Sequence, residues 1–207
     1  MYNYLMNKEI KESREVATSP QERLTTAMRA SQAATDIFDE ALSHFLGINR
    51  TDGRCMDIID RFGRVTAGQL ASESGLTTGA VTVVIDRLES AGYVQRFRDQ
   101  DDRRKVWIET TEATKAIIAR IFGHYATLGP QVLAGFTPEE VSAIVLFLEG
   151  GSLIQRSMAD ILRQHIDPNS KDLKQRLIQA RAFERAALSS APQLIAQIKA
   201  LSPVGSR

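Results

Sequence analysis

The densest group of charged residues in this chain lies between Arg96 and Lys105. Five cations cluster there around three carboxylates: Arg96, Arg98, Arg103, Arg104 and Lys105 around Asp99, Asp101 and Asp102. Guanidinium and ammonium groups bind phosphates through charge-assisted hydrogen bonds, and we expect the aspartates to hold the arginines in place. Taken alone, such a run is more often a solvated turn. The residues on either side of the run decide between these two interpretations.

Strand-like residues flank the charged run. Tyr93–Arg98 and Val106–Thr110 are rich in β-branched and aromatic residues, which predicts the two strands of a hairpin. The seven residues between them are more than a hairpin needs to close. A long basic loop beside a DNA-reading helix can reach the neighbouring minor groove, where the negative potential attracts arginine. The pattern therefore favours a DNA-binding loop.

The segment Thr78–Ser90 is predicted to be that helix. Its apolar residues recur at the spacing of one buried face: Val81, Val84, Ile85 and Leu88. The opposite face has short side chains near its N-terminal end, so the helix can lie deep in a major groove with threonine hydroxyls near base edges. Arg87, on the flank, is better placed for a phosphate. Any solvated helix has such a face, so this helix alone does not decide the function. Its candidate DNA contacts are Thr77, Thr78, Gly79, Ala80, Thr82, Val83 and Arg87.

The elements that must position these residues follow from the hydrophobic pattern and the helix-capping residues. In order they are a long amphipathic helix over 21–46, a helix capped by Thr51 or Asp52 and ending at Gly63, a short helix over 67–74, a turn at Gly75, a helix capped by Thr77 or Thr78, and the charged hairpin. Helix, helix, glycine turn, helix and charged hairpin is the order of a winged helix-turn-helix, whose second helix enters the major groove.

Helices resume after the hairpin. Thr137, followed by Pro138 and two glutamates, predicts a capped helix start. The glycine pair at 150–151 is a place where this helix could kink, and two shorter segments are expected after Pro168, separated near Pro192. These terminal helices carry more apolar surface than a small winged domain can cover, which predicts a homodimer.

The expected fold class is mainly α (α+β), a winged helix-turn-helix with a small β-hairpin wing and a helical dimerisation domain. Five parts are predicted: a polar N-terminal arm over 1–20, a dimerisation helix over 21–47, the DNA-binding domain over 48–112, C-terminal dimerisation helices over 113–165 and a helical extension over 166–207 with no assigned role.

Composition excludes several other classes of protein. A formal net charge of +1 gives no general support for nucleic-acid binding, so a binding face must come from local clustering. One cysteine permits no internal disulfide and suits a reducing cytoplasm. That residue, Cys55, lies on an apolar helix face, where an inert thiol is more common than a redox sensor. The N-terminus carries charges where a secretion signal would be apolar, and no apolar run is long enough for a membrane span.

Catalytic and metal-binding motifs are not evident in the sequence. The three histidines, His44, His124 and His165, are far apart and lack neighbouring ligands at metal-binding spacing. No phosphate-binding glycine loop, nucleophile elbow or catalytic carboxylate pair stands in a motif context. We therefore expect no enzyme activity, no cofactor and no metal.

The hairpin resembles the wing of the MarR family of transcriptional regulators. The wing signature of that family is Asp, any two residues, Asp, any one residue and Arg, followed by a strand that ends in Leu-Thr. Residues 98–104, with 106–108 and 110–112 after them, are similar to this signature. Residues 69–71 and 84–94 resemble the helix pair of that family. In two departures, Thr110 replaces the usual Leu and Thr114 stands where a Gly often follows, so the next helix is expected to begin slightly differently. The resemblance covers 46–112 in motif detail and 21–165 as architecture.

The resemblance implies a symmetric homodimer that reads a near-palindromic operator in double-stranded DNA. By matching positions, Arg104 would enter the minor groove while Asp102 holds it, and Arg87 and Arg103 would contact phosphates. Thr78, Gly79, Ala80 and Thr82 would approach the bases. With Lys105 as a further DNA contact and Asp99 as a further wing support, these residues complete the predicted site.

The resemblance also implies a ligand-responsive regulator, with repression as the commoner mode in the family. A small-molecule effector would bind where the winged domain meets the dimer helices and shift the population of DNA-competent dimers. The alternative is a winged-helix scaffold that binds protein rather than DNA. The basic wing, which such scaffolds have lost, discriminates between the two.

Overall fold

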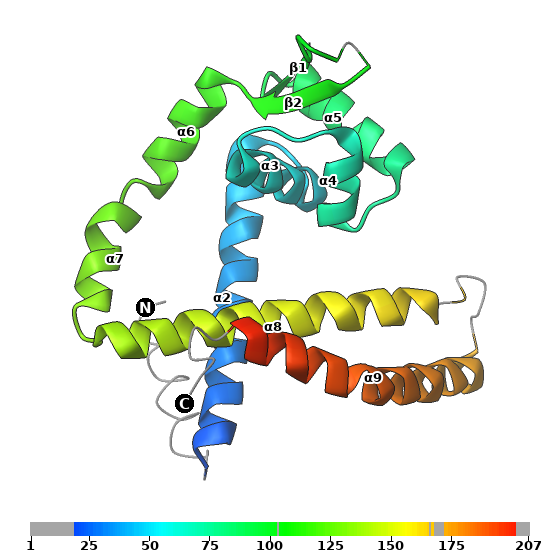
Figure 1. Ribbon diagram of the computed structural model, residues 1–207. Coiled ribbons are helices and arrows are strands. Elements are labelled where there is room, and N and C mark those ends of the chain that lie inside the picture. Colours follow the sequence, from blue (N-terminus) through cyan, green and yellow to red (C-terminus); the bar gives the residue numbers. More distant parts are fainter. Residues whose placement is uncertain (1–18, 103, 166, 168–171, 202–207) are drawn as a thin grey trace. The chain divides into compact units, whose positions relative to one another are not determined.

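The computed structural model describes residues 19–102, 104–165, 167 and 172–201 (Figure 1). It divides into two compact units, the first ending at Gly123 and the second beginning at His124. The first unit contains α2 (Pro20–Leu46), α3 (Arg50–Phe62), α4 (Ala67–Ser74), α5 (Thr78–Ser90), β1 (Val94–Arg98), β2 (Val106–Thr110) and α6 (Glu112–Phe122). The second contains α7 (Tyr125–Leu133), α8 (Pro138–Gln164) and α9 (Leu173–Leu201). The predicted fold class, mainly helical with a small hairpin, is confirmed. Of the predicted arm over 1–20, residues 1–18 lie outside the described residues, whereas Ser19 caps α2 and Pro20 begins it.

Polar caps set where the helices of the first unit begin. Thr77 caps α5, as predicted, by accepting a hydrogen bond from the backbone N–H of Ala80 at 3.2 Å. The prediction that Thr51 or Asp52 caps α3 is wrong, because the cap is Asn49, whose Oδ1 accepts the N–H of Asp52 at 2.9 Å. Asp52 lies inside the first turn, where its carboxylate is free to reach another helix.

The two strands form an antiparallel hairpin in which Phe97 pairs with Trp107 and Arg96 with Ile108. Val65, from the segment between α3 and α4, extends this hairpin by one bridge. Its N–H donates to the carbonyl of Ile108 at 2.9 Å, and the N–H of Ile108 donates back at 2.8 Å. The wing is therefore tied to the chain that enters α4.

One hydrophobic core holds α3, α4, α5 and the hairpin together. The predicted apolar stripe of α5 is confirmed, since all four of its members are buried in this core. Cys55 is buried in the same core, and burial raises the pKa of its thiol, as is typical of an inert cysteine. The core residues are Leu46, Cys55, Met56, Ile58, Ile59, Val65, Leu70, Val81, Val84, Ile85, Leu88, Val94 and Ile108.

In the second unit, α8 and α9 run side by side in opposite directions (Figure 1). Thr137 and Glu140 form the predicted capping box of α8. This helix continues through the glycine pair, where a Cβ added to Gly150 would lie 3.1 Å from the Cγ2 of Ile198. Gly150 therefore permits close packing of the two helices.

The predicted separation near Pro192 is wrong, because α9 is one helix from Leu173 to Leu201. Pro192 lacks the N–H of a helix residue, which by itself favours a break. The side chain of Leu194 is nevertheless buried, and Ile198 approaches Gly150 of α8. Packing against α8 thus stabilises α9 on the C-terminal side of the proline.

None of the described helices is by itself long and apolar enough to cross a bilayer. Only α7 and α8 taken together reach that length and composition, and the pair is bent by 115°.

Candidate nucleic-acid interface

The first two turns of α5 present the short side chains that the sequence singled out. Thr78, Gly79, Ala80, Thr82 and Val83 are all exposed, and Val83 exposes 52% of its surface although it is apolar. The hydroxyl of Thr82 donates to the carbonyl of Thr78 at 3.1 Å, which leaves its methyl group available for contacts outside the helix. An exposed helix face of small and apolar groups can approach base edges and thymine methyls.

A bidentate ion pair anchors α5 to α3. Arg87 donates from Nε to Oδ2 of Asp52 at 3.0 Å and from Nη2 to Oδ1 at 2.5 Å. The Asp52 side chain is only 4% exposed, whereas that of Arg87 is 47% exposed. Asn49 Nδ2 adds a third hydrogen bond to this carboxylate at 2.9 Å. Arg87 thus orients the recognition helix, and a phosphate contact from its remaining Nη1 stays a prediction.

A second arginine clamp joins the wing to α5. Arg96 of β1 pairs with both Asp86 and Glu89, which lie on successive positions of one side of that helix. The expectation that the wing aspartates hold Arg96 is therefore wrong. Arg96 shares a strand face with Ile108, its partner in the hairpin register, and that face packs against α5. The clamp also neutralises two carboxylates that would repel a DNA phosphate.

Asp99 gives the wing loop its shape. Its Oδ1 accepts the backbone N–H groups of Asp101 and Asp102 at 2.9 and 3.0 Å, and its Oδ2 accepts the Nε1–H of Trp107 at 2.6 Å. These bonds stabilise the carboxylate, with the indole donor first in importance, and lower the pKa of Asp99 to about 2. The backbone N–H of Lys105 donates to the carbonyl of Asp102 at 2.9 Å and closes the turn.

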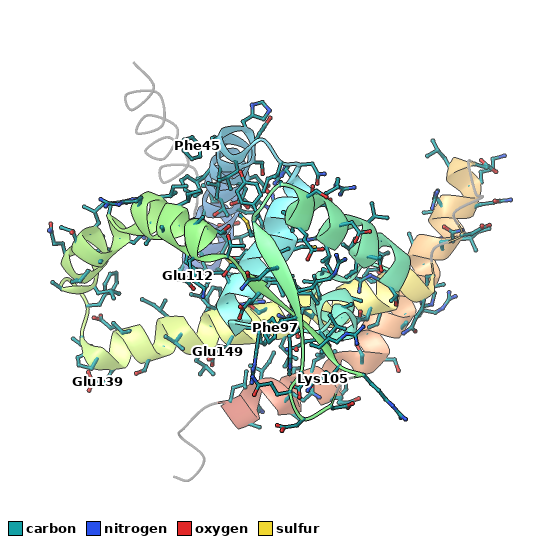
Figure 2. All side chains as sticks on the ribbon, turned by 90° about the horizontal axis from the view of Figure 1, so that it is seen from above. Phe45, Phe97, Lys105, Glu112, Glu139 and Glu149 are labelled. Carbon is teal, nitrogen blue, oxygen red and sulfur yellow. The ribbon has the colours of Figure 1, made fainter. Side chains whose placement is uncertain are left out.

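The tip of the wing carries the predicted minor-groove residue. Asp102 Oδ1 accepts the backbone N–H of Arg104 at 3.0 Å, so Asp102 positions the main chain at Arg104. Within the described part of the chain, no carboxylate forms an ion pair with the exposed guanidinium of Arg104. Lys105 lies near the tip of the hairpin (Figure 2), with its Nζ 4.0 Å from the centroid of the Trp107 ring. Arg103 lies outside the described residues.

Two residues near the wing were not identified from the sequence as part of the site. Trp107 contacts both Asp99 and Lys105, and Arg64 lies 4.8 Å from the centroid of the same ring. Trp107 could have been suspected as the chain's only tryptophan, next to a basic loop. No local pattern marks Arg64, because its proximity depends on the pairing of Val65 with β2.

The two departures from the MarR signature are accommodated where the wing leads into α6. Thr111 caps α6, and its hydroxyl also donates to the carbonyl of Gly92 at 2.9 Å. Thr114 is buried, and its hydroxyl donates to the carbonyl of Tyr93 at 2.8 Å. Thr110 is buried as well, in place of the usual leucine. A hydroxyl network therefore connects the start of α6 to the wing.

The acidic residues, the histidines and the cysteine of the described part of the chain do not gather into a metal site. Nowhere among them do three or more His, Cys, Asp or Glu side chains form a group that could hold a metal ion.

Comparison with known proteins agrees with this geometry. The sequence profile of the MarR family matches residues 48–106. The HTH-type transcriptional regulator YcgE of Bacillus subtilis is 36% identical over 130 residues, which cover 63% of this chain and 84% of that protein. The HTH-type transcriptional repressor YetL of the same organism is 31% identical over 94 residues, covering 45% of this chain and 54% of that protein.

Among solved structures, RV1404 from Mycobacterium tuberculosis is similar with a TM-score of 0.49 and 22% identity, over 66% of this chain and 97% of that one. The profile match spans α3 to the first residue of β2, the segment that carries the exposed helix face and the wing loop. Because YcgE is also matched over most of its length, this chain belongs to the MarR family of DNA-binding transcriptional regulators.

Proposed function

We propose that this protein is a homodimeric repressor that binds a near-palindromic operator and releases it when a small molecule binds. Each protomer would read half of the operator with α5 in the major groove and the wing in the adjacent minor groove. Thr77, Thr78, Gly79, Ala80, Thr82 and Val83 would lie at or near the bases. Arg104 would enter the minor groove, and Arg87, Arg103 and Lys105 would contact phosphates.

The observation that carries this proposal is the difference between the arginines of the helix-turn-helix and wing. Arg87 and Arg96 are held by carboxylates that connect elements of the fold. Arg104 is exposed, and its backbone is positioned by Asp102 on a loop that Asp99 keeps in shape. An exposed guanidinium on a preorganised loop can bind a polyanion without first breaking an ion pair.

Exposed apolar side chains support the proposed dimer. On α2, Ile37 exposes 51% and Phe45 73% of its surface, and Ile144 and Leu148 of α8 are exposed as well. Such apolar residues on long helices favour burial against a second copy. In this proposal the helix over 21–47 and the helices over 113–165 form the dimer interface. The predicted extension over 166–207 has no assigned role, and α9 within it packs on α8.

A cavity in the first unit supports the proposed effector site. It lies between α2, α3 and α6 and has a volume of about 890 Å³, within the range usual for small-molecule sites. Apolar side chains from all three helices line it together with four carboxylates and two arginines. They are Leu42, Leu46, Met56, Ile117, Ile118, Ile121 and Phe122, then Asp36, Asp39, Asp57 and Asp60, and Arg50 and Arg54. This lining suits an amphipathic molecule.

Two further parts of the proposal rest on analogy and composition. Repression is proposed from the similarity to YetL, which is named as a repressor. A cytoplasmic location is proposed because duplex DNA is the partner and a lone cysteine suits a reducing compartment.

A gel-shift titration on DNA from upstream of the protein's own coding sequence, repeated across a salt series, tests the proposal. We expect a discrete complex whose affinity falls steeply with salt, because phosphate contacts release counterions. Size-exclusion chromatography with light scattering should give the mass of a dimer both free and on DNA. A monomer in both states would refute the dimer. The absence of binding at low salt to any promoter-proximal fragment would refute the regulator and favour a protein-binding scaffold instead.

A further inference from the structure

At the outer edge of the wing, Lys105, already proposed as a phosphate contact, lies beside a second cation, Arg64, to which the proposed function gives no role. Arg64, which precedes the bridge between Val65 and Ile108, lies with its guanidinium 4.8 Å from the centroid of the Trp107 ring. Lys105 lies with its ammonium 4.0 Å from the same centroid. Two segments distant in sequence therefore bring two positive charges to one indole ring.

The ring that holds this pair is fixed in orientation. Trp107 donates its indole N–H to Asp99 Oδ2 at 2.6 Å, and the other oxygen of Asp99 holds two backbone N–H groups of the loop. The orientation of the indole is thus coupled to the shape of the wing. The electron-rich face of an indole attracts each cation. Two like charges on one ring nevertheless repel each other, and a bound anion would relieve that repulsion.

Arg64, like Arg104, differs from four other arginines of the first unit in that no carboxylate pairs with it among the described residues. Arg50, Arg61, Arg87 and Arg96 each form an ion pair with a carboxylate. Among the residues whose placement is described, no such pair involves Arg64, and its side chain is exposed. A planar guanidinium with free donors is the group best suited to a phosphate.

The strand register shows on which side of the wing the pair lies. Neighbouring residues of a strand point to opposite faces, and Ile108 is buried on the face that packs against α5. Trp107 and its register partner Phe97 therefore occupy the other face, and Figure 2 shows Phe97 and Lys105 along this hairpin. An anion held by Arg64 and Lys105 would lie on the side of the wing that faces away from the recognition helix.

We propose that Arg64 and Lys105, gathered on Trp107, form a clamp for one DNA backbone phosphate on the outer side of the wing. This inference rests on the proposed binding of DNA by α5 and the wing. It adds Arg64, from outside both, and places it with Lys105 on one phosphate. Because a phosphate carries no base identity, the clamp raises affinity for all duplexes alike and fixes the position of the wing on the backbone.

The salt dependence of binding tests the clamp directly. Affinity of the full-length protein for a fluorescein-labelled random-sequence duplex would be measured by anisotropy across a salt series. The logarithm of the binding constant falls linearly with the logarithm of the salt concentration. Loss of one phosphate contact makes this slope less steep by about 0.9 per bound protomer. We expect this decrease for Arg64→Ala and a slope near that of the wild type for Arg64→Lys, which keeps the charge. Arg61→Ala is the matched control, because it removes an equal charge that Glu73 already pairs.

A second readout uses Trp107, the only tryptophan in the chain. Iodide, an anion, should quench its fluorescence strongly in the free protein, and less after duplex is added or after Arg64→Ala. Thermal unfolding of each variant would identify a loss of fold, and Arg64→Gln replaces Arg64→Ala if that variant unfolds. An unchanged salt slope in folded Arg64→Ala or Arg64→Gln, with normal binding by the wild type, would overturn the clamp alone. No binding of duplex by the wild type would overturn the clamp and the proposed function together.

Discussion

Substitution of Gly79 by alanine is expected to stabilise the recognition helix and, at the same time, to weaken its binding to DNA. Gly79 is the second residue of α5 and is exposed, and a Cβ added there would meet no atom within 4 Å. Alanine is favoured over glycine in helices by about 0.5–1 kcal/mol, and we expect about 0.5 kcal/mol in this first turn. Against DNA, a methyl that displaces one good base contact costs about 1.4 kcal/mol, a tenfold loss of affinity.

Gly68 offers a matched control on the neighbouring helix. It is the second residue of α4, is also exposed and has the same open space, and each of the two helices begins after a threonine cap. Gly68→Ala should therefore raise the melting temperature as much as Gly79→Ala does. It should leave DNA affinity within about twofold of the wild type, since α4 is not the helix proposed to read base edges.

Thermal unfolding followed by circular dichroism, and anisotropy titrations on a duplex selected from random DNA, would measure both effects. The expected result is two stabilised variants of which only Gly79→Ala binds more weakly. Equal, near-wild-type affinity of both variants would refute the placement of the first turn of α5 against the bases. An equal loss in both would show that the added methyl acts through α4 as much as through α5.

Three further predictions concern other parts of the chain. Arg104→Ala should weaken binding to the selected duplex while the protein keeps its fold and dimer mass, and unchanged affinity would remove Arg104 from the minor groove. Partial desolvation at the wall of the cavity, with repulsion from Asp60 and Asp39, raises the pKa of Asp57, so the folded state holds its proton more tightly than the unfolded state. This group therefore destabilises the fold as pH rises through its shifted pKa. Asp57→Asn should raise the melting temperature at neutral pH and lose that advantage below the unfolded pKa near 3.8; a constant difference would contradict the assignment. Gly150→Val should cost about 1–3 kcal/mol by overpacking against Ile198, and Ile198→Ala should partly restore stability in the double variant.

Local patterns predicted most elements because each depends on residues a few positions apart. The apolar stripe of α5, its cap at Thr77 and the alternation along the hairpin are such patterns. The two errors arose where a local rule met a competing interaction. Asp52 was expected to cap α3, but its carboxylate binds Arg87 on another helix. Pro192 was expected to end a helix, but packing on α8 carries α9 through it.

The sequence predicted which residues form the candidate site, but it predicted less well which other side chains those residues contact. A basic loop next to a helix with short side chains could be identified because its members are close in sequence. The partner of Arg96 could not, since it depends on which strand face turns toward α5. Asp102 was expected to hold Arg104, and the structure adds that it does so through the backbone.

By itself, the sequence of this protein determined the helix-turn-helix order, the long charged wing and its likeness to the MarR family, because periodicity, caps and motif spacing are local properties of a chain. The tertiary structure decided which of the wing's charges remain available to DNA. Arg96 is bound by α5, and Arg64 reaches Trp107 only because Val65 pairs with Ile108. The reason is physical: whether a cation can bind a phosphate depends on the carboxylates and rings that folding brings beside it, and those neighbours come from distant parts of the chain.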